Sequence, residues 1–167
     1  ASLNPRFTIG QTLVEPMVIH GIGKDLAERE QRARTLLEKV GLDGRAFGKY
    51  PHEFSGGQRQ RICIARALMM EPELLVADEA VSALDVSVQA QVLRLFEEIR
   101  SRLNLAMLFI THDLRVASQI CDHLAVMSKG EVVEYGPAHQ VFGNPQHAYT
   151  QALFAAAPGR DFAFGVA

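Results

Sequence analysis

The sequence has 167 residues, of which 48% are hydrophobic and 22% are charged, a balance typical of a globular domain with a buried core. The formal net charge is -2, so the chain lacks the basic field that favours nonspecific binding of nucleic acid or of anionic membranes. No apolar run approaches the roughly 20 residues that span a bilayer, and the first residues do not form a signal peptide. These features exclude a membrane-spanning segment and disfavour a nucleic-acid partner.

The first seventy residues are predicted to be mostly helical. Helices are expected over 11–20 and 25–40, the second opening with the N-capping residue Asp25 and stopping at Gly41. A third helix is expected from about Gly56 to Met70. This first part of the chain is therefore expected to form a helical layer.

The third helix begins in an unusual way, within the stretch SGGQRQR at 55–61. Ser55 is a good N-cap, while Gly56 and Gly57 let a ligand approach a helix start whose free N–H groups carry partial positive charge. These residues outline an anion-binding site. A capped helix that merely has glycine in its first turn explains them equally well, so the local pattern leaves both readings open.

After the helical part, the period of the apolar residues changes. Short and nearly continuous apolar runs at 73–78 and 105–111 are typical of parallel strands that are covered on both faces of a sheet. Residues 86–104 between them form a helix of the length that a right-handed crossover needs. We therefore expect a parallel β-α-β unit.

The last part of the chain is predicted to hold a short helix at 113–120, a β-hairpin turning at Lys129-Gly130, and a helix near 148–156. The two cysteines, Cys63 and Cys121, lie in apolar stretches without a CxxC partner, so buried reduced thiols are expected. The histidines at 20, 52, 123, 139 and 147 show no metal-ligand spacing.

Polar side chains end both predicted strands. Asp78 and Glu79 follow the first strand, and His112 follows the second. The carboxyl ends of parallel strands face the ligand crevice of an open sheet, so these groups are placed for chemistry. Taken singly, an acidic pair at a strand end is often the solvated start of a loop, and a lone histidine often caps a helix. Their occurrence on two neighbouring strand ends favours function.

The order of these features closely resembles the ATP-binding subunit of an ABC transporter. SGGQRQR is similar to the signature motif, LLVADE at 74–79 to the Walker B strand, SALD at 82–85 to the D-loop, and THD at 111–113 to the switch-histidine loop. The resemblance covers essentially the whole chain. The stretches ASLNPR at 1–6, YPHEFSGGQRQRICIARAL at 50–68 and NPQHAYTQALFAAAP at 144–158 look like the ATPases of oligopeptide and dipeptide importers.

The resemblance implies a role for each matching residue. Asp78 would hold Mg²⁺ of MgATP, Glu79 would orient or deprotonate the attacking water, and His112 would contact the γ-phosphate. The signature residues would bind ATP held by a second ATPase subunit in a head-to-tail dimer, and Asp85 would work across that interface. This binding set comprises Ser55, Gly56, Gly57, Gln58 and Asp85, with Arg59 beside it. The glycines are expected to meet a phosphate rather than a neighbouring side chain.

Two departures from the family pattern stand out. The sequence contains no G-x-x-x-x-G-K-[ST] string, and the only decoy, Lys24 in GIGKD, follows no strand. The P-loop and the glutamine of the Q-loop precede a segment like ASLNPR in the family, so we expect the C-terminal portion of a nucleotide-binding domain that alone binds MgATP weakly and does not hydrolyse it. The second departure is Ala80, where the importers usually have proline; alanine relaxes that turn without removing a catalytic group.

The expected fold class is α/β, a partial P-loop NTPase-like (ABC ATPase) domain. Residues 1–70 would form the helical subdomain with the signature motif, and 71–167 the C-terminal part of the ATPase core with an importer-type tail. The helical subdomain resembles the part that receives transmembrane permease subunits, which implies a peripheral location at the cytoplasmic face of the membrane. Since neighbouring strands would be missing from the sheet, the chain is expected to self-associate.

The leading interpretation is an ATPase subunit that drives uptake of peptides or a similar small solute. A soluble ABC-type ATPase of DNA repair or translation shares the core motifs, but the short stretch between the signature helix and the Walker B pair leaves no room for a coiled-coil insertion. A non-catalytic binding or regulatory module that keeps half an ATPase fold is the third alternative.

Overall fold

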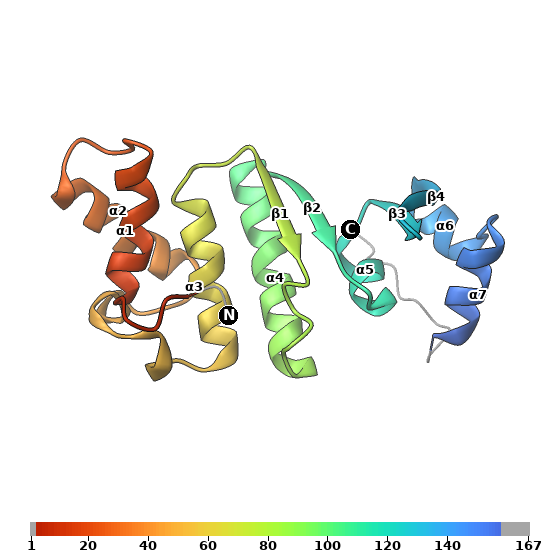
Figure 1. Cartoon of the computed structure of the whole chain (residues 1–167), viewed down its shortest axis with the longest axis horizontal. Helices are drawn as coiled ribbons and strands as arrows, with labels where there is room; N and C mark the ends of the chain where they lie inside the picture. Colours follow the sequence, from red (N-terminus) through yellow and green to blue (C-terminus); the bar gives the residue numbers. More distant parts are fainter. Residues whose placement is uncertain (1–2, 158–167) are drawn as a thin grey trace. The chain divides into compact units, whose positions relative to one another are not determined.

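The computed structural model describes residues 3–157, whose helices and strands are shown in chain order in Figure 1. The helical first part contains α1 (Ile9–Ile19), α2 (Leu26–Lys39), the short 3₁₀ helices η1 (Gly44–Gly48) and η2 (Pro51–Glu53), and α3 (Gly56–Leu68). It is followed by β1 (Leu74–Asp78), α4 (Val86–Leu103), β2 (Ala106–Ile110) and α5 (Leu114–Ile120). The last elements are β3 (His123–Ser128), β4 (Glu131–Pro137), α6 (Ala138–Gly143) and α7 (Ala148–Ala156).

The expected α/β class is confirmed, including the parallel β-α-β unit. Strands β1 and β2 pair in a two-stranded sheet, with α4 as the crossover between them. The amide of Ala106 donates to the carbonyl of Glu73 at 3.0 Å, and the amide of Glu79 donates to the carbonyl of Ile110 at 3.0 Å. The first bond joins the N-terminal ends of the two strands and the second joins their C-terminal ends, so the strands run parallel.

The described residues cover only one face of these strands, although the apolar runs suit both faces to burial. Leu75 and Ala77 are buried, but Leu74, Val76 and Leu108 are exposed by 55%, 53% and 52% of their surface. Successive side chains of a strand point to opposite sides of a sheet, so Leu74 and Val76 share one side, which is open, and Leu75 and Ala77 share the covered side. A continuous apolar run indicates that a strand can be buried on both faces. It does not indicate whether both faces are in fact covered.

The helices begin at capping residues, as the sequence predicted for two of them. Asp25 accepts a hydrogen bond from the amide of Glu28 at 2.8 Å, and Ser55 accepts one from the amide of Gln58 at 3.3 Å. Such bonds satisfy amides that have no partner inside the helix. The observed ends differ slightly from the expected ones: α3 stops at Leu68 rather than Met70, and α6 was not anticipated.

The β-hairpin is confirmed and turns at Lys129-Gly130, whose φ angles of 51° and 86° are both in the left-handed region. Two such residues are typical of the tight turn that matches the twist of a hairpin. Strands β3 and β4 pair antiparallel from His123–Pro137 to Ser128–Glu131, with a shift in register between Val126 and Met127.

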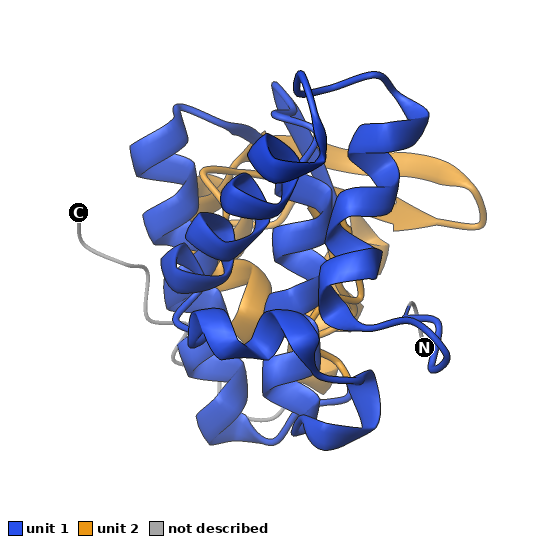
Figure 2. Cartoon of the chain, turned by 90° about the vertical axis from the view of Figure 1, so that its left-hand side faces the viewer, with its two compact units in different colours: residues 1–76, 83–108 blue, residues 77–82, 109–167 orange. Residues whose placement is uncertain are grey.

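The chain divides into two compact units, coloured separately in Figure 2. Unit 1 comprises residues 1–76 and 83–108, and unit 2 comprises 77–82 and 109–167. The fully buried large apolar side chains of unit 1 are Ile9, Leu13, Met17, Leu37, Val40, Ile62, Val92 and Phe96. The expected domain boundary near residue 70 stays a prediction.

Unit 2 has its own apolar cluster. It is formed by Ala117, Val126, Ala138, Val141, Phe142 and Phe154. The rings of Phe142 and Phe154 stack with centroids 5.0 Å apart, which joins α6 to α7. No helix within 3–157 combines the length and the apolar character that crossing a bilayer requires.

Candidate functional site

In unit 2, the two polar strand ends meet as the sequence predicted. Nδ1 of His112, after β2, lies 2.9 Å from Oε1 of Glu79, after β1. A carboxylate can only accept a hydrogen bond, so the imidazole nitrogen donates. The parallel pairing of β1 and β2 places these two residues at the same end of the sheet, where their side chains form an acid–base pair.

The backbone of Glu79 is held in an uncommon conformation. Its φ of 50° lies in the left-handed region, which residues other than glycine seldom occupy. The amide and the hydroxyl of Ser82 both donate to the carbonyl of Glu79, at 3.3 Å and 3.0 Å. Together with the Glu79 amide bond to Ile110, these contacts fix the turn that carries the carboxylate.

The hydrogen bond that His112 donates to Glu79, followed by the negative charge of Glu79, raises the pKa of His112 above the ordinary value of 6.5. The folded protein therefore binds this proton more tightly than the unfolded chain. The pair stabilises the fold below about pH 6.5, and this contribution is lost as the pH rises through the folded-state pKa. The His112 side chain is 76% exposed, so the effect on stability is small.

We expect an NMR titration of the His112 ring protons to give a pKa above 6.5, and a Glu79→Gln variant to bring it back toward 6.5 because the neutral amide no longer stabilises the imidazolium. Glu73→Gln, which removes an exposed carboxylate before the same strand, is the matched control and should leave the titration unchanged. Equal titration curves for the native chain and Glu79→Gln would contradict the contact.

Asp78 has the chemistry of a magnesium ligand. It is the last residue of β1, its side chain is exposed, and within residues 3–157 this side chain makes no hydrogen bond or ion pair. Carboxylate oxygens suit Mg²⁺, which is usually held by one or two carboxylates together with phosphate oxygens and water. The described residues contain no group of three or more acidic, histidine or cysteine side chains that would hold a metal by themselves. The donor set therefore fits a metal shared with a phosphate ligand.

In unit 1, the signature residues build a capped helix start. Ser55 and Gln58 form a capping box: the Ser55 hydroxyl accepts from the amide of Gln58, and Oε1 of Gln58 accepts from the amide of Ser55 at 3.0 Å. In the described part of the chain, the amides of Gly56 and Gly57 make no hydrogen bond. Two first-turn donors are thus left for an anion.

Gly57 also packs against a neighbouring helix, while the expected contact of its N–H group with a phosphate stays a prediction. This residue is buried, and a Cβ added to it would collide with Cγ1 of Val88 on α4. A Cβ on Gly56 would meet only Cδ2 of Leu84 at 3.6 Å, an ordinary contact. Helix packing therefore gives a reason for glycine at position 57 that the sequence did not reveal.

Asp85 is the N-cap of α4. Its Oδ1 accepts from the amide of Val88 at 3.0 Å and from the hydroxyl of Ser87 at 2.7 Å. The bond from the Val88 amide, followed by that from Ser87, lowers the pKa of Asp85. The carboxylate thus has a role within this chain, and its expected work across a subunit interface stays a prediction.

The cysteines are free thiols, but both are only partly buried. Sγ of Cys121 donates to the carbonyl of Ala117 at 2.8 Å, and burial raises the pKa of this thiol. Neither residue lies among the predicted site residues.

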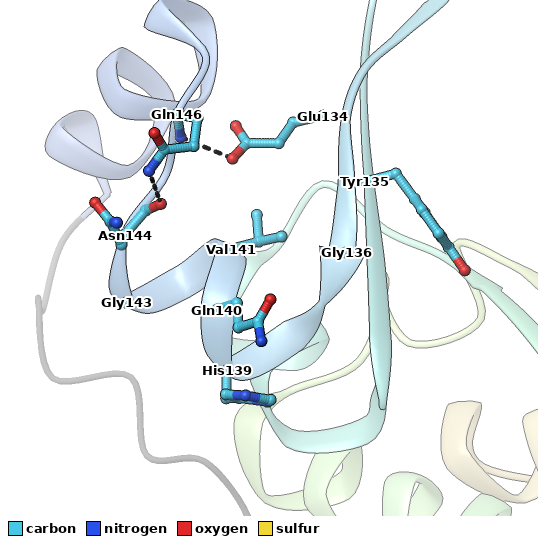
Figure 3. Close-up of a pocket in the computed structure, with 9 residues that line it drawn as sticks. All are labelled: Glu134, Tyr135, Gly136, His139, Gln140, Val141, Gly143, Asn144 and Gln146. Atoms are coloured by element: carbon cyan, nitrogen blue, oxygen red, sulfur yellow. Dashed lines mark hydrogen bonds between the residues drawn. The ribbon is translucent and has the colours of Figure 1, made fainter.

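A pocket of about 450 Å³ lies in unit 2 beside β4 and α6 (Figure 3). There the Glu134 carboxylate accepts from the backbone amide of Gln146 at 2.8 Å, whereas the Gln146 side chain donates to the carbonyl of Asn144 at 2.7 Å. The pocket is lined by Glu134, Tyr135, Gly136, His139, Gln140, Val141, Gly143, Asn144 and Gln146. None of these is a predicted site residue, so the pocket is separate from the Glu79–His112 pair.

Comparison with known proteins supports the resemblance. The family model described as ABC transporter matches residues 1–82. The glutathione import ATP-binding protein of Salmonella typhimurium (strain LT2) is 52% identical over 161 residues, covering 96% of this chain and 26% of that protein. An ATP-binding protein of Brucella abortus (strain 2308) named for peptide import is 53% identical over 161 residues, covering 96% of this chain and 50% of that protein. The chain thus spans half or less of the length of these relatives.

Solved structures agree with the fold. A dimeric ATP-binding cassette, MJ0796, in a post-hydrolysis state bound to ADP and Pi, matches 82% of this chain and 59% of its own with a TM-score of 0.70 and 28% identity. The ADP conformation of another cassette, MJ1267, matches 92% of this chain and 64% of its own with a TM-score of 0.75; at 22% identity this likeness concerns the fold alone. Motifs, fold and relatives together show a partial ABC ATPase fold, in a chain that over 96% of its length is similar to ATP-binding proteins named for peptide and glutathione import.

Proposed function

We propose that this chain carries the signature and Walker B part of an ATPase subunit that drives import of peptides or a small peptide-like solute such as glutathione. The observation that carries the proposal is the contact between His112 and Glu79, in a chain whose relatives are named for such import. The relatives' names support the substrate class.

The residues of unit 2 take distinct roles in this proposal. Glu79 orients the attacking water and accepts its proton, and His112 donates a hydrogen bond to the transferring phosphoryl group. Asp78 would hold Mg²⁺, which supplies charge neutralisation on the phosphate oxygens when MgATP is bound. The exposed position of all three side chains leaves room for a phosphate ligand.

The residues of unit 1 act on a second nucleotide in this proposal. The free amides of Gly56 and Gly57, with Ser55 and Gln58 beside them, would bind the γ-phosphate of ATP held by an opposing ATPase subunit. The dimeric form of the similar cassette MJ0796 supports such a partner. Transmembrane permease subunits would complete the importer, with the ATPase peripheral to the cytoplasmic face of the membrane.

The first experiment is to measure MgATP binding by calorimetry and phosphate release with the purified chain, with Glu79→Gln and Glu73→Gln variants beside it. The chain lacks the P-loop string, so we expect neither binding at micromolar nucleotide nor turnover. This result supports a chain that holds only part of the ATP site.

Two other outcomes are informative. Turnover that Glu79→Gln abolishes and Glu73→Gln preserves would support the role of Glu79 and contradict the expected inactivity. Turnover that survives Glu79→Gln would overturn the proposed role of this carboxylate.

A further inference from the structure

The first turn of α3 packs against the first turn of α4 so tightly at Gly57 that there is no space for a side chain. Gly57, in the first turn of α3, is buried, and Cγ1 of Val88 occupies the place where a Cβ on Gly57 would lie. Both residues belong to unit 1. Real Cβ atoms do not approach carbon this closely, so any larger residue at 57 must displace Val88 or the first turn of α3.

The neighbouring glycine provides an internal comparison. Gly56 precedes Gly57 in the same turn, yet it is exposed, and its nearest side-chain atom would be Leu84 Cδ2 at the ordinary distance of 3.6 Å. The amides of both glycines are without a hydrogen-bond partner within residues 3–157. The two glycines therefore do not differ in their amides. They differ in packing, because only Gly57 has no space for a Cβ.

Val88 is itself fixed by the cap of its helix. Its amide donates to Oδ1 of Asp85 at 3.0 Å, and that oxygen also accepts from the Ser87 hydroxyl. Valine has one strongly preferred side-chain rotamer in a helix, so fixing the backbone also fixes Cγ1. A chain of contacts thus runs from the Asp85 carboxylate through Val88 to the signature turn.

We propose that Val88 is a positioning residue that holds the first turn of the signature helix in place, and that its contact, rather than ligand access, requires glycine at position 57. Any effect of Val88 on phosphate binding rests on the proposed function, because the amides that Val88 positions are those proposed to bind the γ-phosphate. The packing statement itself concerns only this chain.

The test is a double-mutant cycle on the thermal midpoint of the 167-residue chain. Gly57→Ala should lower the midpoint by about 3 to 10 °C, whereas Gly56→Ala should change it little. In a Val88→Ala background, Gly57→Ala should cost less than about 2 °C, because the colliding methyl group is gone. Val86→Ala, a matched truncation at an exposed position of the same helix turn, should not relieve the loss.

A local measurement separates positioning from general stability. In hydrogen exchange, Val88→Ala should increase the rates of the Gln58 and Arg59 amides, which bond to the cap residue Ser55, more than those of the second half of α3. Val88→Ile, which keeps the β-branch, should restore them. A uniform increase along α3 would mean a structural role only and would overturn the positioning role.

An equal midpoint loss for Gly57→Ala with and without Val88 would overturn the packing requirement. Neither measurement uses nucleotide, so failure to observe ATP binding would leave both results intact. Conversely, additive midpoints, together with the expected lack of ATP binding and turnover, would refute this inference and spare the proposed function.

Discussion

Replacing Gly10 with alanine is expected to lower the free energy of unfolding by about 1 to 3 kcal/mol, and with it the denaturant concentration at the unfolding midpoint. Gly10 is buried in α1, and a Cβ there would lie 2.5 Å from Cζ and 2.6 Å from Cδ1 of Phe47. The ring has Arg34 above it, with the guanidinium carbon 4.0 Å from the centroid. Overpacking would push the ring away from α1 and from this cation–π contact.

Denaturant unfolding followed by circular dichroism measures this effect. Gly48→Ala is the matched control, because a Cβ at this exposed position would meet nothing within 4 Å. The control should lie within about 0.5 kcal/mol of the native chain. If Gly10→Ala matched the control, the ring of Phe47 would have to move without cost, contrary to the packing described.

The second large effect concerns the open side of the sheet. Leu74, Val76 and Leu108 expose about half of their surface on two neighbouring strands of unit 1, and the two-stranded sheet leaves an unpaired edge on each described strand. Contiguous apolar surface and open strand edges favour association. We therefore expect sedimentation at micromolar concentration to detect species heavier than a monomer.

Charge on this face should weaken the association. A Val76→Lys/Leu108→Lys double variant is expected to raise the dissociation constant at least about tenfold, because burial of even one aliphatic side chain contributes more than 1.4 kcal/mol. Ile19→Lys/Leu26→Lys, which adds the same charge at exposed helix positions, is the control for solubility. A monodisperse native chain, or equal effects of both double variants, would contradict association through the sheet face.

The sequence predicted the part of the site that depends on two neighbouring strand ends, which is the proximity of Glu79 and His112. The parallel pairing of β1 and β2 brings Glu79 and His112 together, which follows from two apolar runs and a helix of crossover length. The contribution of Ser82 was missed. Its position inside SALD gave a signal, but only the left-handed φ of Glu79 shows what its two hydrogen bonds hold.

The sequence by itself determined the order of the elements apart from α6, the caps of α2 and α3, and the family motifs, because caps, turns and apolar periods depend on residues close together in the chain. Only the tertiary structure decided which strand faces stay open and why position 57 is glycine. Those outcomes depend on which side chains of distant segments share a space: Val88 fills the place beside Gly57, and the described residues leave 53% of the Val76 surface exposed.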